Sequence, residues 1–187
     1  MVATMTERNS QKPVEVSVVL PAYNEADRVE TAVEKTGQAL REFTSSLELI
    51  IAEDGSTDGT AERADELAKK APFVKHIHGK NRLGRGTALK NAFRQSSGRI
   101  LVYMDVDLAT NIDHLKPLVR AVDEEGYDFA VGSRLLSASK VKRSRTRLIV
   151  SKLYNFLVRA MLGSKVKITN VGLKLSSAKH YSNCLMK

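Results

Sequence analysis

"RILVYMDVDLAT", residues 99–110, is an apolar run that ends in two aspartates separated by one residue. The apolar residues 100–104 are typical of a buried strand. Asp105 and Asp107 would point to the same side if that strand continued, and two carboxylates this close repel each other unless a cation lies between them. The stretch therefore predicts a buried strand whose carboxyl end could hold a hard divalent ion such as Mg²⁺ or Mn²⁺.

Strand and helix signals alternate along the first two thirds of the chain. We expect strands at 14–20, 47–53, 74–78, 99–104 and 127–133. Helices are expected between them: one capped by Asp27 and running through Leu40, one through Leu67 and Ala68, one over 87–95 and one over 111–125. This order predicts an α/β fold, in which a mostly parallel central sheet carries helices on both faces.

Polar residues follow four of the expected strands, at the edge where ligands bind in such sheets. They are Tyr23, Asn24 and Glu25, then Glu53, Asp54 and Asp58, then Asp105 and Asp107, and finally Ser133 and Arg134. A polar cluster after a single strand is common in proteins without a site, whereas four clusters at one edge predict a binding site. A D-x-D pair alone is weak evidence for a metal site, because one aspartate can cap a helix while the other is solvated.

Charge divides the 187-residue chain, whose length suits one domain and whose net charge is +9. Residues 129–187 hold 13 of the 30 Lys and Arg residues and none of the 21 Asp and Glu residues. Such a segment suggests contact with an anionic partner, although a basic surface kept for solubility is the plain alternative. Residues 1–13 are polar, so we expect a flexible tail and not a secretory signal. The single cysteine fits a reducing compartment.

Five stretches in this order resemble glycosyltransferase family 2, with its nucleotide-sugar-binding GT-A fold. They are "VSVVLPAYNEADRV", "LELIIAEDGSTDGT", "NRLGRGTALKNAF", "ILVYMDVDLAT" and "FAVGSRLL". "DVDLAT" followed by "RSRTRLIVSKLYNFLVRAMLG" is similar to enzymes that load a sugar onto polyprenyl phosphate, the dolichyl-phosphate glucosyl- and mannosyltransferases among them. The resemblance implies an inverting transfer of a hexose from a nucleotide-diphosphate sugar, of UDP-glucose type or GDP-mannose, to a polyprenyl or dolichyl phosphate.

The resemblance also implies a role for individual residues. The residues implied to bind the donor are Pro21, Ala22, Tyr23, Glu25, Asp54, Gly55, Asn81, Arg82 and Gly84. Within this set Tyr23 would face the base, Glu25 the ribose and Asp54 the base edge, while 81–84 would form a loop over the donor. Asp105 and Asp107 would hold the metal and Arg134 would meet a phosphate or the sugar, so these three are the implied catalytic residues.

The basic segment is expected to meet the acceptor. Arg143, Arg147 and Ser151 recur every four residues, so they would share one face of a helix. We expect 140–167 to be a basic amphipathic helix at a membrane interface, although a helix that only covers the sheet is an alternative. Arg134, Arg147, Ser151 and Lys174 are the candidate acceptor-binding residues. A phosphate acceptor is already anionic and needs cations to hold it, whereas a hydroxyl acceptor needs a base.

The expected protein is thus one catalytic domain over 14–187, peripheral on the cytoplasmic face of an anionic membrane and shortened at its carboxyl end. Residues 168–174, "ITNVGLK", depart from the "DTQCGFK"-like stretch of relatives, with Ile168 at the position of an aspartate. Two other functions stay open: a family 2 enzyme with a glycan or other hydroxyl acceptor, and a basic nucleic-acid-binding module. The second is disfavoured, because few aromatics accompany the cations and the carboxylates at the strand ends would repel phosphate. We therefore expect no nucleic-acid partner.

Overall fold

The structure, a computed structural model, describes residues 14–132 and the backbone of residues 173–177. Its elements follow in the order β1 (Val16–Ala22), α1 (Ala26–Arg41), β2 (Leu47–Asp54), α2 (Thr60–Lys70), β3 (Val74–Gly79), α3 (Arg85–Arg94), β4 (Ile100–Met104), the 3-10 helix η1 (Ile112–His114), α4 (Leu115–Asp123), β5 (Phe129–Val131) and β6 (Leu173–Ser177). Within these ranges no helix combines the length and the hydrophobicity needed to cross a lipid bilayer.

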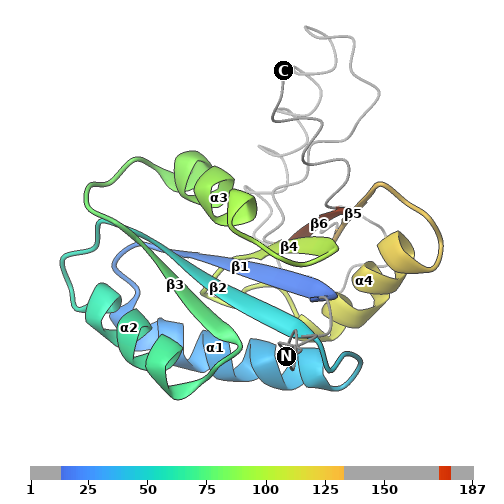
Figure 1. The fold of residues 1–187 in the computed structure, drawn as a ribbon, viewed down its shortest axis with the longest axis horizontal. Helices are drawn as coiled ribbons and strands as arrows, with labels where there is room; N and C mark the ends of the chain where they lie inside the picture. Colours follow the sequence, from blue (N-terminus) through green and yellow to red (C-terminus); the bar gives the residue numbers. More distant parts are fainter. Residues whose placement is uncertain (1–13, 133–172, 178–187) are drawn as a thin grey trace, which may run out of the picture.

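The strands form one sheet in the order β3-β2-β1-β4-β6-β5 (Figure 1). The pairs β3–β2, β2–β1 and β1–β4 are parallel, and β6 runs antiparallel to both β4 and β5. The predicted α/β fold with a mostly parallel sheet is therefore confirmed. The carboxyl ends of β1, β2 and β4 come to the same edge, as the site prediction requires.

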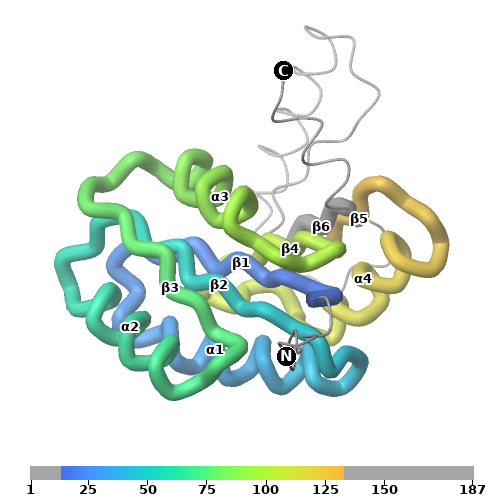
Figure 2. Tube along the Cα trace, in the orientation of Figure 1, coloured from blue at the N-terminus to red at the C-terminus, as the bar shows by residue number. Residues whose placement is uncertain are grey.

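Helices cover both faces of the sheet (Figures 1 and 2). Because side chains alternate along β1, Val18 and Leu20 pack into the core on the side of α1, α2 and α4. Val19 points the other way and packs with Ile50 and with Ala92 of α3. An apolar run suits a strand buried on both faces, which explains why the first strand carries so few polar residues.

Glu48 is the main polar group within the sheet. Its carboxylate accepts hydrogen bonds from Ser17 Oγ (2.6 Å), Ser97 N (2.9 Å) and Lys75 Nζ (2.9 Å), and so links β1, β2, β3 and the approach to β4. Burial alone would raise the pKa of Glu48, but these hydrogen bonds and the charge of Lys75 together lower it below its ordinary value. Gly98 packs closely here, because a Cβ at that position would lie 2.5 Å from Ser17 N.

Three details differ from the sequence expectations. Asp27 lies in the first turn of α1 and is not its cap. The start of this helix is held instead by Asp58 of the β2–α2 loop and by Thr60, the first residue of α2. α3 begins at Arg85, two residues before the expected start. The expected helix over 111–125 is divided into η1 and α4, with Pro117 in the first turn of α4, where a missing N–H costs nothing.

Candidate active site

Two loops after β1 and β2 are joined side by side at the carboxyl edge of the sheet. Asn24 N donates to Ser56 Oγ (3.0 Å), and Asn24 Oδ1 accepts from Thr57 N (2.9 Å). Asn24 has a φ of 55°, a left-handed conformation that asparagine tolerates better than most residues. Asp58 accepts from Ala26 N and from Thr60, and the hydrogen bond from the Thr60 side chain is the main reason why its pKa is lowered. These contacts fix the backbone that directly follows Tyr23.

Asp54, the last residue of β2, holds the loop at 81–84. Its two carboxylate oxygens accept from Leu83 N (2.9 Å) and Gly84 N (2.7 Å). Gly55 follows with a φ of 74°, and a Cβ there would lie 2.6 Å from Arg82 N, so only glycine allows this loop to approach. Asp54 thus has a local structural partner that the sequence did not reveal, and its contact with a nucleobase stays a prediction.

Tyr23 and Arg82 face each other across the site. The Arg82 guanidinium carbon lies 3.9 Å from the centroid of the Tyr23 ring, which is a cation–π contact. The Arg82 side chain is exposed, so a planar base could replace the guanidinium on the Tyr23 ring. Glu25 lies beside this pair and forms an ion pair with Arg28 at 2.9 Å.

An open pocket of about 170 Å³ lies where these groups meet. Its lining residues are Pro21, Ala22, Tyr23, Glu25, Asp54, Arg82, Arg85 and Ala88. The first six belong to the predicted donor-binding set, so the structure brings them together around one space. The other three residues predicted to bind the donor do not line the pocket. Gly55, Asn81 and Gly84 belong to the two loops beside it.

Asp105 lies just beyond β4 and is held by two neighbours. Its Oδ1 accepts from Tyr103 Oη (2.5 Å) and lies 3.2 Å from Arg85 Nη1, which also donates to Tyr103 Oη (3.1 Å). Burial, together with the hydrogen bond to Asp105, raises the pKa of Tyr103, so its hydroxyl stays protonated and donates. The arrangement fixes one oxygen of Asp105 while leaving the side chain partly exposed.

Asp107 is exposed in the turn after β4, where its Oδ1 accepts from Ala109 N (2.9 Å). Leu108, between Asp107 and Ala109, has a φ of 49°, which bends the chain sharply after the strand. Asp105 and Asp107 offer carboxylate oxygens, the ligands that Mg²⁺ and Mn²⁺ prefer, at the same end of the sheet as the pocket. These carboxylates therefore fit a divalent cation, which would neutralise charge on a bound diphosphate.

The remaining predicted residues have a different standing. Arg134, Arg147 and Ser151, and the helix expected over 140–167, lie outside the described residues. Lys174 lies in β6, where its backbone is paired with Tyr103 of β4 and Val131 of β5. Sequence reasoning missed Arg85, which lines the pocket and contacts Asp105. Arg85 directly follows Gly84 and is the first residue of α3, but the helix expected from the sequence begins only at residue 87 and so leaves it out.

A sequence profile described as "Glycosyl transferase family 2" matches residues 17–183. The chain belongs to glycosyl transferase family 2. Two curated relatives are "Glycosyltransferase AglD" of Haloferax volcanii, 46% identical over 88% of this chain, and "Dolichol-phosphate mannosyltransferase" of Pyrococcus furiosus, 34% identical over 69% of it. This chain spans 27% and 36% of the lengths of these two relatives.

A solved structure of glucosyl-3-phosphoglycerate synthase from Mycobacterium tuberculosis, in complex with Mn²⁺, UDP and glucosyl-3-phosphoglycerate, is similar as a fold. The TM-score is 0.62 at 27% identity, over 89% of this chain and 57% of that one. These findings confirm the family 2 resemblance and the GT-A fold that this resemblance implied.

Proposed function

We propose that this family 2 chain is the donor-binding, catalytic part of an inverting glycosyltransferase that moves a hexose from a nucleotide-diphosphate sugar to a polyprenyl phosphate. The observation that carries this proposal is the pocket between the strand ends of β1 and β2, bordered by Arg85 and the Asp105 network. The dolichol-phosphate mannosyltransferase relative supports the acceptor class, and the UDP complex of the similar fold supports the donor class.

The pocket residues would divide the donor between them. Tyr23 and Arg82 offer an aromatic face and a planar cation for a base, and Glu25 offers a carboxylate for ribose hydroxyls. Asp54 holds the 81–84 loop through its two backbone hydrogen bonds, and we propose that this loop covers the donor. The sugar diphosphate would then extend toward Asp105 and Asp107.

Asp105 and Asp107 would hold Mn²⁺ or Mg²⁺ against the diphosphate. When bound, such an ion stabilises the charge that develops on the leaving nucleoside diphosphate. Tyr103 and Arg85 keep one oxygen of Asp105 in place, so that ligand is oriented before the donor arrives. In the transfer, an acceptor phosphate oxygen forms a bond to the anomeric carbon while the bond from that carbon to the diphosphate breaks.

A phosphate acceptor requires no general base, which agrees with the composition of residues 129–187. Thirteen cations without an acid suit an acceptor phosphate and anionic lipid headgroups. We propose that Arg134, Arg147, Ser151 and Lys174 bind the acceptor, and that the segment 140–167 lies on the cytoplasmic face of a membrane. Nucleic acid is not a partner in this proposal.

Calorimetry of UDP and GDP binding tests the metal role. Binding should be much tighter with Mn²⁺ or Mg²⁺ than with EDTA, and Asp107→Ala should remove that difference while leaving the melting temperature unchanged. Asp113→Ala, which removes another exposed carboxylate after β4, is the matched control. Equal nucleotide affinity with and without metal would contradict the proposal.

Transfer assays distinguish the acceptor classes. Short-chain polyprenyl phosphate should accept the hexose, whereas a hydroxyl acceptor such as 3-phosphoglycerate, suggested by the similar solved structure, should not. Arg134→Ala and Arg147→Ala should slow transfer without weakening donor binding. Lysine in place of either arginine should restore only part of the rate, because lysine cannot form the two parallel hydrogen bonds that a guanidinium makes to a phosphate. Parent rates in both variants would place the acceptor elsewhere.

Vesicle binding tests the membrane role separately. Lys140→Glu and Lys142→Glu should weaken retention on anionic vesicles, and added salt should have the same effect because these contacts are screened. Retention on DNA that equals retention on vesicles would favour the nucleic-acid alternative.

A further inference from the structure

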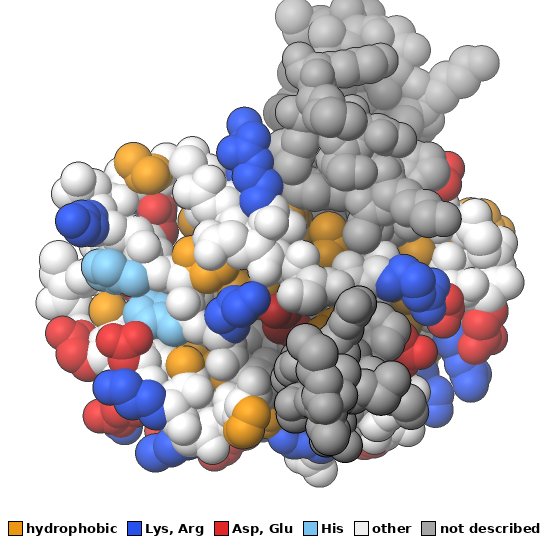
Figure 3. Space-filling model, viewed as in Figure 1, with side chains coloured by type: hydrophobic (Ala, Val, Ile, Leu, Met, Phe, Trp, Pro, Cys, Tyr) orange, Lys and Arg blue, Asp and Glu red, His pale blue; other side chains and the backbone are white. Residues whose placement is uncertain are grey.

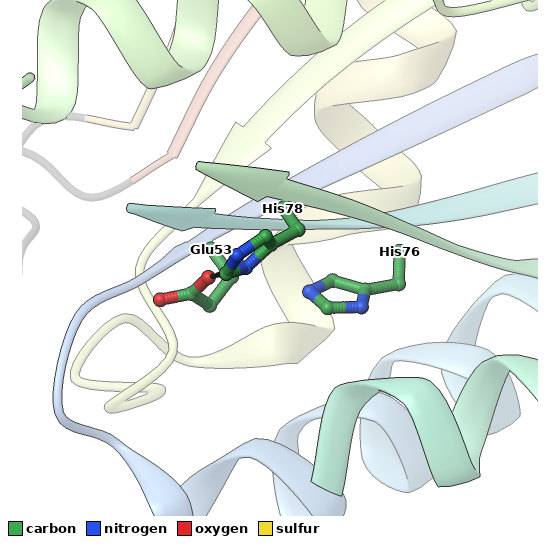
Figure 4. A group of neighbouring side chains, drawn as sticks. All are labelled: Glu53, His76 and His78. Atoms are coloured by element: carbon green, nitrogen blue, oxygen red, sulfur yellow. Dashed lines mark hydrogen bonds and ion pairs between the residues drawn. The ribbon is translucent and has the colours of Figure 1, made fainter. Parts of the chain in front are cut away.

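A second group of potential metal ligands lies on the opposite side of β2 from α3. Glu53 of β2 is the register partner of His78 on the edge strand β3, and His76 lies two residues earlier, so all three side chains share one face. One candidate ligand atom from each lies within 4.8 Å of the others. Figure 4 shows the His76 ring directed edge-on toward Glu53 and His78.

Burial makes this group unusual. The Glu53 side chain is 0% exposed and that of His76 is 5% exposed, whereas His78 is 51% exposed and gives access from solvent. His76 Nε2 is buried and has no hydrogen-bond partner among the described residues. A buried polar atom without a partner is costly, so it favours a ligand at that point.

The other nitrogen of His76 is oriented for metal binding. His76 Nδ1 lies 2.6 Å from Asp65 Oδ1 of α2. An ionised carboxylate can only accept, so in the neutral ring His76 Nδ1 carries the proton and Nε2 offers a lone pair. A carboxylate that holds one ring nitrogen while the other binds an ion is the usual arrangement around a metal-bound histidine.

Glu53 is also held in place. Its Oε1 accepts from Ser56 N in the turn after β2, and its Oε2 lies 2.6 Å from His78 Nδ1. Figure 3 shows histidine side chains at the surface of this region with acidic side chains beside them. His76 and Glu53 are therefore positioned by hydrogen bonds to α2 and to the β2–α2 loop, and His78 is positioned by its hydrogen bond to Glu53.

We propose that Glu53, His76 and His78 bind a transition-metal ion of the zinc type. Two imidazole nitrogens and one carboxylate are typical ligands of Zn²⁺, whereas Mg²⁺ prefers oxygen ligands alone. For the ion to bind between them, the neutral His78 ring takes the tautomer with its proton on Nε2, so that Nδ1 and Glu53 Oε2 both offer a lone pair. This site is separate from Asp105 and Asp107 in both position and preferred metal.

The ion would join the edge strand to its neighbour. Among the strands that the structure describes, β3 is paired with β2 alone, and a metal between Glu53 and the two histidines would tie it to β2 close to the turn at Ser56. Because Glu53 directly precedes Asp54, the same ion would stiffen the base of the donor pocket. Ions that bind only the native state raise its stability by mass action.

Zinc calorimetry and cobalt absorption on the metal-stripped 187-residue chain test this proposal. Asp107→Asn and Cys184→Ser are introduced first, so that neither the other carboxylate pair nor the thiol contributes. This parent should bind one Zn²⁺ and melt at a higher temperature when Zn²⁺ is bound. With Co²⁺ it should give the visible absorption bands that are typical of a low coordination number. His76→Gln and His78→Gln should each weaken Zn²⁺ binding about 100-fold or more.

Two further variants separate a built site from adventitious histidine binding. His114→Gln removes an exposed histidine of η1 and should leave Zn²⁺ affinity unchanged. Asp65→Asn should weaken it about 10–100-fold, as changes to the partner of a ligating histidine do. Glu53→Gln keeps an acceptor for Ser56 N, so it tests the ligand role if a histidine variant fails to fold. Zn²⁺ affinity that is absent in the parent, or equal in parent, His76→Gln and Glu53→Gln, would overturn the proposal.

Discussion

Replacing Asp54 by alanine removes the acceptor of two backbone hydrogen bonds, those from Leu83 N and Gly84 N. A hydrogen bond to a charged group contributes about 1.5–3 kcal/mol. The loop is exposed and its N–H groups can turn to water, so we take the lower figure for each bond and expect a loss of about 3 kcal/mol. For a chain of this size that corresponds to a melting temperature about 6–12 °C lower.

The same variant separates two routes by which Asp54 could affect the donor. If Asp54 acts by holding the 81–84 loop, Asp54→Ala should weaken binding of UDP and of a base-free ribose diphosphate alike, because Arg82 moves with the loop. If Asp54 also contacts the base, UDP should lose more affinity than the base-free ligand. Calorimetry of both ligands gives the two affinities, and a melting curve gives the stability.

Glu34→Ala is the matched control, because it removes an exposed carboxylate from α1 far along the chain from this loop. An Asp54→Ala protein that melts within about 1 °C of this control would refute the reasoning about the loop. Unchanged affinity for both ligands would show that Asp54 is only a turn residue.

Three other substitutions test contacts within and beside the sheet. Glu48→Gln should destabilise by about 1–3 kcal/mol at neutral pH. Because the folded pKa of Glu48 is lowered, its contribution is complete above the ordinary value of 4.5 and is lost as pH falls through the folded value, so urea unfolding of parent and variant should converge in acid. Gly98→Ala should cost about 1–3 kcal/mol in urea unfolding, since its Cβ would meet Ser17 N at 2.5 Å; an unchanged midpoint would contradict this. Tyr103→Phe should keep the fold but reduce the metal-dependent part of UDP affinity, because Asp105 loses the hydroxyl that orients it; calorimetry with Mn²⁺ and with EDTA measures that part.

The sequence predicted the parallel part of the fold because its signals are local. An apolar run such as 100–104 marks a strand wherever it packs, and the spacing of runs and helices then determines the order of the units. The sequence did not predict β6, because "LKLSS" is short and mixed in polarity. This segment forms a strand because its backbone pairs with β4 on one side and β5 on the other. Tertiary pairing, not local propensity, selects such a segment.

In the candidate site, sequence reasoning found residue types but not their partners. Strand ends identified Tyr23, Asp54 and Asp105, since polar residues after parallel strands gather at one edge. Whether Asp54 meets a ligand or a loop depends on how closely 81–84 approaches Gly55, which is a fact of tertiary packing. The pairing of His78 with Glu53 likewise depends on strand register, so the sequence alone singles out neither His76 nor His78 as a candidate.

The position of β6 has a consequence for the order of folding. β5 is made before β6, but its partner in the sheet is β6, so β5 cannot pair until residues 173–177 have left the ribosome. Until then β4 is paired only with β1, and its other edge is open to wrong partners. Contacts this distant in sequence form slowly, because a long loop must close first. We therefore expect strands β1, β2, β3 and β4 to assemble early and the pairing of β6 with β4 and β5 to be the late step. The risk of aggregation during synthesis is highest before that late step.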